Sequence, residues 1–130
     1  MSGRYTVLPD LYYIPDVTRI QLQSATNKQG SAEQHPNAEH LRRQIEEATA
    51  RSRETYNYLI EAGIAREVAR LVLPVNQYSR MRASANLRNW LGFLSLRDAD
   101  GVQWEMRQYA ITVAGFIKER FPRTYALWTE

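Results

Sequence analysis

The spacing of apolar residues predicts a long helix in the first half of the chain. From residue 38 to residue 62, apolar and small side chains recur at alternating intervals of four and three, which is the pattern of one helical face. Asn37 can cap the start of this helix, and Gly63 can end it. The positions expected to face inward are Leu41, Ile45, Ala48, Ser52, Thr55, Leu59 and Ala62. The opposite face carries balanced charges, which favours a solvent-exposed surface over a nucleic-acid surface.

Four more helices are expected after the long one. A short helix over residues 65–73 ends before Pro74, which cannot continue it. A helix from about Gln77 to Leu96 follows, and another runs from Val102 to Phe121. Pro122 then begins a short terminal helix through Trp128, since proline is favoured in a first helical turn. The inner side of the helix over 102–121 is predicted to comprise Met106, Tyr109, Ala110, Val113, Ala114 and Ile117.

The helix over residues 77–96 combines apolar and polar side chains in an unusual way. Its second half is apolar almost all round, which indicates burial in a core or an oligomer interface. Asn86, Phe93 and Arg97 nevertheless share one stripe, with about 16 Å along the axis between the first and the last. This stripe could line an elongated anionic ligand, or its polar groups could bond to each other and to nearby acids. The apolar residues concerned are Leu87, Trp90, Leu91, Phe93, Leu94 and Leu96.

The N-terminal part of the chain has a different pattern. Residues 5–8 and 11–14 are β-prone runs bounded by prolines, which predicts two short strands. Residues 24–37 are almost free of apolar side chains and predict a surface loop. The expected fold is therefore α+β and predominantly helical, with short N-terminal strands followed by about five helices. We expect residues 1–130 to form a single domain, because no linker divides them.

Composition limits the possible chemistry. The chain has 130 residues, 44% of them hydrophobic, with 17 basic and 14 acidic side chains, which argues against disorder. No apolar run approaches the roughly 20 residues that cross a bilayer, so we expect no membrane partner and a cytoplasmic protein. The absence of cysteine excludes disulfides and thiol nucleophiles. Only Lys28 and Lys118 are lysines, and the other basic residues are arginines, whose planar fork suits carboxylates and phosphates.

Metal and nucleic-acid sites are not predicted. Asp98, Asp100 and Gly101 lie in a turn that lacks the remaining ligands of a calcium loop. His35 and His40 have no further ligands at metal spacing, so we interpret them as surface histidines. A net charge of +3, without a basic stripe interleaved with aromatics, argues against a nucleic-acid partner.

Several separated blocks of the sequence resemble the flavin-dependent thymidylate synthases, the ThyX family. The hallmark of that family reads Arg-His-Arg-x-x-Ser-x-Asn-Glu-x-Ser-x-Arg-Tyr, and this chain opens on its tail, Ser2-Gly3-Arg4-Tyr5. The resemblance therefore implies the C-terminal part of such an enzyme, with the β-rich part largely in a separate N-terminal piece. The further matching blocks are Arg66–Pro74, Asn86–Asn89, Phe93–Arg97, Gln103–Ala110 and Phe121–Tyr125.

The resemblance also implies an activity and its partners. Enzymes of this family methylate dUMP to dTMP with methylenetetrahydrofolate, FAD and NADPH, and they use no cysteine nucleophile. The chain is then expected to be incomplete as an enzyme, to need a complementing N-terminal segment, and to form a homo-oligomer, with a tetramer favoured. The alternative is a helical oligomerisation or interaction remnant of the family without catalysis.

Site residues follow from the same resemblance. Ser2, Gly3 and Arg4 resemble part of the dUMP site, and Arg70 resembles the arginine that reaches dUMP from a neighbouring subunit. Arg97 resembles the catalytic residue that holds the uracil ring and favours its N3-ionised form, as a fixed cation would.

A second group of residues resembles the flavin site. Asn86, Leu87 and Arg88 resemble the segment that contacts FAD. Gly92 stands where relatives commonly have Asn or His near the flavin, and Gly101 stands where they often have His. These two departures remove hydrogen bonds and ring contacts, so weaker flavin binding or turnover is expected.

Overall fold

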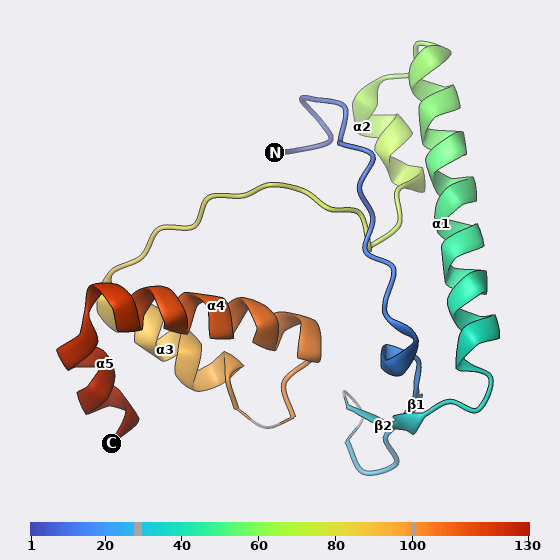
Figure 1. The fold of residues 1–130 in the computed structure, drawn as a ribbon. Coiled ribbons are helices and arrows are strands. Elements are labelled where there is room, and N and C mark those ends of the chain that lie inside the picture. Colours follow the sequence, from blue (N-terminus) through green and yellow to red (C-terminus); the bar gives the residue numbers. More distant parts are fainter. Residues whose placement is uncertain (28–29, 100) are drawn as a thin grey trace. The chain divides into compact units, whose positions relative to one another are not determined.

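The structure, a computed structural model, describes residues 1–27, 30–99 and 101–130. It is predominantly helical with one short two-stranded sheet, which confirms the expected fold class (Figure 1). The described chain separates into two compact units, Met1–Leu22 with Ala32–Arg82 and Gln23–Ser31 with Ala83–Glu130. The single domain expected over residues 1–130 stays a prediction. The elements in chain order are η1 (Val17–Arg19), β1 (Gln21–Gln23), β2 (Ser31–Gln34), α1 (Ala38–Glu61), α2 (Arg66–Ala69), η2 (Arg70–Val72), α3 (Leu87–Arg97), α4 (Trp104–Arg120) and α5 (Pro122–Thr129).

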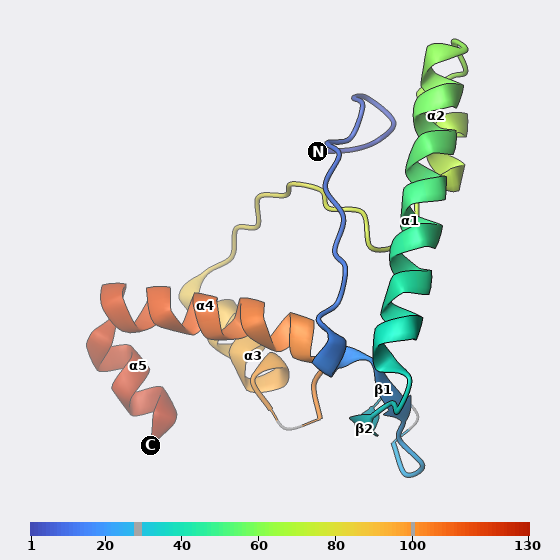
Figure 2. The ribbon, with the colours of Figure 1, turned by 45° about the vertical axis from the view of Figure 1, so that its right-hand side comes forward.

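Helix α1 has the predicted bounds but a different buried face. It follows Asn37 and ends before Gly63, whose φ of 78° explains the glycine at this position. Its buried residues are Ala38, Thr49 and Tyr56, so the inner stripe is rotated by about one residue from the predicted one. The rotation reflects what α1 contacts, because it packs on α2 and η2 (Figure 2) and on the N-terminal segment.

Side chains of α1 hold the N-terminal segment in the same unit. Arg42 donates through Nε to the carbonyl oxygen of Pro15 at 3.0 Å, and Arg53 forms a 3.2 Å ion pair with Asp10. These long-range contacts involve polar residues, so the apolar periodicity of α1 could not predict them.

The strands predicted near the N-terminus are wrong. Residues 5–8 form none, because the backbone N–H groups of Tyr5 and Thr6 instead donate to the carbonyl oxygen of Ser2 in a turn. Of residues 11–14, only Tyr12 makes a β-bridge, and its partner is Gln77. The sheet consists of β1 and β2, and β2 lies inside the segment 24–37 that was expected to be a loop. Its residues are mostly exposed, as a surface segment would be.

The second unit is built on α3, α4 and α5. Its core consists of Leu94, Ala110, Ala114 and Ile117, with half-buried Val113 packed against it. Four of the six positions predicted for the inner side of α4 are therefore confirmed. Tyr109 is 61% exposed and Met106 is 39% exposed, so these two positions were predicted wrongly. Trp128 of α5 donates through Nε1 to Ser95 Oγ of α3 at 3.2 Å, which ties the last helix to this core.

Helix α3 is shorter than predicted and is not buried all round. It begins at Leu87, and Asn86 caps it by accepting a 2.9 Å hydrogen bond from the backbone N–H of Asn89. Only Leu94 of α3 is fully buried, and Leu96 is 69% exposed. Residues 77–86 are not helical, since Tyr78 pairs with Leu11.

Candidate functional site

The first three predicted dUMP residues form a tight turn at the start of the chain. The carbonyl oxygen of Ser2 accepts hydrogen bonds from the backbone N–H groups of Tyr5 at 3.0 Å and Thr6 at 3.2 Å. The hydroxyl of Ser2 accepts from the backbone N–H of Arg4 at 3.3 Å. The turn thus has a defined shape, and the Arg4 side chain projects from it into solvent.

The turn approaches η2 closely at Gly3, which is buried. A β-carbon added to Gly3 would lie 3.3 Å from Leu8 Cδ1 and 3.6 Å from the β-carbon of Arg70. A larger residue at this position would push the turn away from η2. The structure therefore brings together the four residues predicted to bind dUMP in the first unit.

Arginines from three parts of the first unit surround this turn. Arg66 donates through Nη1 to the carbonyl oxygen of Tyr5 at 3.3 Å, and Arg4 lies 3.5 Å from Glu67. Both partners of the latter ion pair are 57% exposed, so the pair contributes little to stability and Arg4 can exchange Glu67 for another anion. With Arg70 exposed beside the turn, the region suits a phosphate, whose oxygens accept charge-assisted hydrogen bonds.

The remaining predicted site residues lie on or next to α3 in the second unit. Phe93 and Arg97, four residues apart, share one side of α3. Asn86 caps the helix from an extended backbone, so helical spacing does not place its side chain on the predicted stripe. Arg88 and Gly92 lie on a different, exposed side. Helix α3 can therefore present two separate polar surfaces, one around Arg97 and one around Arg88.

Gly92 and Gly101, both in this unit, differ in backbone conformation. A β-carbon at Gly92 would meet nothing within 4 Å, so the position could carry a side chain. Gly101 has a φ of 83°, a conformation that other residues adopt only with strain. The histidine that relatives often have there would be strained in this chain. Asp100, part of the predicted turn, lies outside the described residues.

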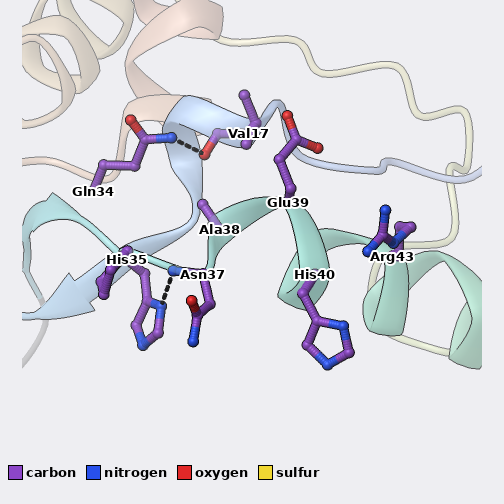
Figure 3. Close-up of a pocket in the computed structure, with 9 residues that line it drawn as sticks. Val17, Gln34, His35, Asn37, Ala38, Glu39, His40 and Arg43 are labelled. Carbon is purple, nitrogen blue, oxygen red and sulfur yellow. Dashed lines mark hydrogen bonds between the residues drawn. The ribbon is translucent and has the colours of Figure 1, made fainter.

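A hollow of about 570 Å³ lies in the first unit, at the start of α1 (Figure 3). His40 is exposed, and Nδ1 of His35 accepts a 3.0 Å hydrogen bond from the backbone N–H of Asn37. None of the predicted site residues lines it, and over residues 1–27, 30–99 and 101–130 no group of three potential ligands could hold a metal ion. Its lining residues are Val17, Gln34, His35, Pro36, Asn37, Ala38, Glu39, His40 and Arg43.

The shifted pKa values also belong to other parts of the first unit. Hydrogen bonds from the backbone N–H and hydroxyl of Thr18 hold the pKa of Asp16 below its usual value. Burial, with a further contribution from the Asp10 charge, raises the pKa of Tyr12. Among the described residues, no helix is both long enough and apolar enough to span a bilayer.

Three residues near the turn were not predicted as site residues: Arg66, Glu67 and Gln77. The four-residue spacing of Arg66 and Arg70 was a signal for the first, since it places both on one helical face. No pattern in the sequence indicated the contact of Glu67 with Arg4 or the hydrogen bonds of Gln77. Both depend on segments that are far apart in the chain.

Characterised proteins resemble this chain over most of its length. It is 41% identical over 127 residues to the flavin-dependent thymidylate synthase of Kosmotoga olearia, covering 95% of this chain and 54% of the relative. It is 40% identical over 132 residues to that of Thermus thermophilus, covering 100% of this chain and 47% of the relative. The chain thus spans about half the length of the curated relatives it matches.

Solved structures also resemble this chain over almost its whole length. The UMP/dUMP methylase PolB from Streptomyces cacaoi, bound with 5-Br dUMP, has a TM-score of 0.85 and 31% identity, covering 99% of this chain and 59% of that one. The same protein bound with 5-Br UMP has a TM-score of 0.89 and 32% identity, with coverage of 99% and 62%. The family Thy1, described as thymidylate synthase complementing protein, matches residues 1–123. With this match over most of its length, the chain belongs to the Thy1 family, that of the flavin-dependent thymidylate synthases.

Proposed function

We propose that this chain is the C-terminal piece of a flavin-dependent thymidylate synthase, which methylates dUMP to dTMP with methylenetetrahydrofolate, FAD and NADPH. The observation that carries the proposal is the approach of Gly3 to Arg70, which joins four of the five predicted dUMP residues in the first unit. The relatives named above support it, since they are flavin-dependent thymidylate synthases and a UMP/dUMP methylase. The rest of the enzyme comes from a separate N-terminal segment.

The phosphate of dUMP binds at the Ser2–Arg4 turn. Arg4 leaves its exposed partner Glu67 and donates to phosphate oxygens, which is favourable because a dianion attracts a guanidinium more strongly than a carboxylate does. Arg70 supplies a second guanidinium. Its β-carbon lies beside the turn of its own chain, and its exposed side chain is long enough to serve a neighbouring subunit as well, as the resemblance implies.

The uracil ring binds at Arg97, in the last turn of α3. A fixed guanidinium beside the ring stabilises negative charge on N3 and the neighbouring carbonyl oxygens, so it makes C5 a better nucleophile toward the methylene group that methylenetetrahydrofolate supplies. Arg97 is the catalytic residue in this proposal. It is exposed in the described chain, so substrate can reach it.

The start of α3 fits the pyrophosphate of FAD. A helix N-terminus attracts phosphate through its backbone N–H groups, and Arg88 stands exposed in the first turn. Gly92 lies one turn further along on an open surface, where the isoalloxazine or ribose can approach the backbone. FAD would supply the redox chemistry, and Asn86, Leu87 and Arg88 would hold and orient it.

Exposed apolar side chains support assembly with other chains. In the first unit Leu71 is 77% exposed and Met81 is 87% exposed, and in the second Phe116 is 63% exposed. Such surfaces are normally covered by a partner. The N-terminal segment and further copies of the chain, in a tetramer, would cover them.

The test is reconstitution. The chain is mixed with the N-terminal part of the Kosmotoga olearia relative, and flavin absorbance and dTMP formation are measured. The mixture should bind FAD and form dTMP, while the Arg97→Ala mixture binds FAD without turnover. Arg120→Ala, an exposed arginine at the end of α4, serves as the matched control and should keep activity. Turnover by the chain alone, or none by the mixture, would contradict the proposal.

The alternative is a non-catalytic oligomerisation remnant, and the 69% exposure of Leu96 beside Arg97 is the observation that favours it. An oligomer contact through this face would cover the residues proposed to bind uracil. Calorimetric titration with dUMP separates the two functions. Saturable binding that Arg97→Ala abolishes excludes the remnant.

A further inference from the structure

The side chain of Gln77 joins two chain segments that carry predicted dUMP residues. Its Nε2 donates to the carbonyl oxygens of Pro9 at 2.8 Å, Leu11 at 3.0 Å and Tyr78 at 2.8 Å. Pro9 and Leu11 follow the Ser2–Arg4 turn in the sequence. A single amide group therefore fixes the backbone that leads out of this turn.

Backbone hydrogen bonds on either side of Gln77 extend the connection. The N–H of Tyr13 donates to the carbonyl oxygen of Asn76 at 2.8 Å, and the N–H of Tyr78 donates to that of Leu11 at 2.9 Å. The Asn76 side chain adds a 2.8 Å bond from Nδ2 to the carbonyl oxygen of Tyr13. The two segments are thus paired antiparallel over a few residues, and the side chain of Gln77 reaches beyond them toward the turn as far as Pro9.

The surroundings of the Gln77 amide nitrogen require a hydrogen-bond donor. Three carbonyl oxygens lie within hydrogen-bond distance of its nitrogen, so its two N–H groups serve all three with one N–H shared between two of them. Within the part of the chain that the structure describes, the buried Oε1 of Gln77 accepts no hydrogen bond. All the hydrogen bonding of this amide is therefore directed at the backbone it holds.

Leu8 connects this backbone to the Ser2–Arg4 turn. This residue directly precedes Pro9, and its Cδ1 is the atom that a β-carbon on Gly3 would meet at 3.3 Å. On the other side, the backbone N–H of Gln77 donates to the carbonyl oxygen of Pro74 at 3.1 Å, in the segment that leaves η2 and Arg70. Gln77 is thus connected both to the turn and to the segment after Arg70.

We propose that Gln77 is a positioning residue for the dUMP phosphate site, which it holds in shape without touching the nucleotide. The inference rests on the proposed function, since it assumes that the Ser2–Arg4 turn and Arg70 bind the phosphate. Removal of the amide leaves three carbonyl oxygens without their donor and frees the backbone around Pro9. The turn then samples positions in which its N–H groups and Arg4 no longer converge with Arg70.

The experiment compares Gln77→Met with Gln44→Met. Methionine has a similar length and no donor, and Gln44 is an exposed residue of α1 whose amide donates to the neighbouring Glu47. Calorimetry on the chain assembled with its N-terminal segment measures affinity for dUMP and for deoxyuridine, which lacks the phosphate. Hydrogen exchange on the chain alone follows the amides of Tyr5 and Thr6, which close the turn.

Gln77→Met should weaken dUMP binding about tenfold, because a lost buried hydrogen-bond donor has an effect of this order. It should leave deoxyuridine binding and FAD retention unchanged, and it should speed exchange at Tyr5 and Thr6. Gln44→Met should change none of these. Unchanged dUMP affinity, or an equal loss for deoxyuridine and FAD, would overturn the inference. If the unaltered assembly binds no dUMP, the proposed function fails, and unchanged exchange would then separately show that Gln77 does not hold the turn.

Discussion

The β-carbon of Arg70 lies 3.6 Å from the place that a β-carbon on Gly3 would occupy. This relationship joins the N-terminal turn to η2 across more than sixty residues of sequence. It depends on the absence of a side chain at Gly3, which also contacts Leu8. Substitutions of Gly3 by residues of increasing size test how much space this position has.

Gly3→Val should weaken dUMP binding more strongly than Gly3→Ala. The alanine β-carbon meets the end of the flexible Leu8 side chain at 3.3 Å, so a small shift of Leu8 accommodates it. Valine adds two methyl groups in a buried site, and such overpacking typically costs about 1–3 kcal/mol. Calorimetric titration with dUMP and thermal unfolding measure the two effects. Equal affinities for the valine and alanine variants would show that the turn does not need to approach η2.

Gly92 and Gly101 should respond in opposite directions to alanine. Gly92 lies inside α3 with open space around it, so Gly92→Ala should stabilise the second unit by about 0.5–1 kcal/mol. Gly101→Ala should destabilise it by about 1 kcal/mol, because alanine is strained at a φ of 83°. Chemical denaturation followed by circular dichroism measures both. Stabilisation by Gly101→Ala would contradict the positive φ of this residue.

Gly92→Asn should in addition strengthen flavin binding, since it restores a side chain that relatives commonly present at this position. Gly92→Ala is the matched control, because it gives the same helical backbone without the amide. Flavin absorbance of the reconstituted assembly, titrated with FAD, measures the difference. Equal FAD affinity for the asparagine and alanine variants would mean that this surface of α3 does not face the flavin.

Apolar periodicity predicted the helices well where they pack on neighbours through an apolar face. It failed where polar contacts with distant segments determine the end or the buried face of a helix. The bounds of α1 were predicted to within one residue and those of α4 to within two, although the Asn37 side chain expected to cap α1 makes no capping hydrogen bond. The start of α3 was missed by ten residues, because Gln77 and Tyr78 pair with the N-terminal segment rather than extend the helix. The inner face of α1 was misplaced for a similar reason, since Thr49 accepts a hydrogen bond from Asn76.

The candidate site was predictable from resemblance more than from physical pattern. Ser2, Gly3, Arg4 and Arg70 came from matching motifs, and their proximity was visible only in the structure. The stripe of Asn86, Phe93 and Arg97 was predicted from helical spacing, but Asn86 caps α3 from an extended backbone, so the stripe stays a prediction. The amide of Gln77 could not be assigned from sequence, because its three acceptors are backbone atoms, which carry no sequence signal.

Acidification should remove a stabilising contribution of Asp16. Its carboxylate accepts hydrogen bonds from Thr18, so the folded pKa is lower than the unfolded value of about 3.9. A lowered folded pKa means that the stabilisation is present above the unfolded pKa and is lost as pH falls through the folded one. Asp16→Asn should therefore flatten the loss of stability below about pH 4. Identical acid profiles for the asparagine variant and the unaltered chain would exclude this contribution.

Asn86 has two roles to separate, the cap of α3 and the contact with FAD. Its Oδ1 accepts a hydrogen bond from the backbone N–H of Asn89, so Asn86→Ala should destabilise the second unit by about 1 kcal/mol. Asn86→Asp keeps the cap oxygen and should retain stability, because aspartate caps helices as well as asparagine does. It also replaces the amide N–H donors with a negative charge, which repels the phosphates of FAD. The aspartate variant should thus unfold like the unaltered chain in circular dichroism and bind FAD more weakly in absorbance titrations. Unchanged FAD affinity in this variant would restrict Asn86 to capping α3 and leave flavin binding to Arg88 and its neighbours.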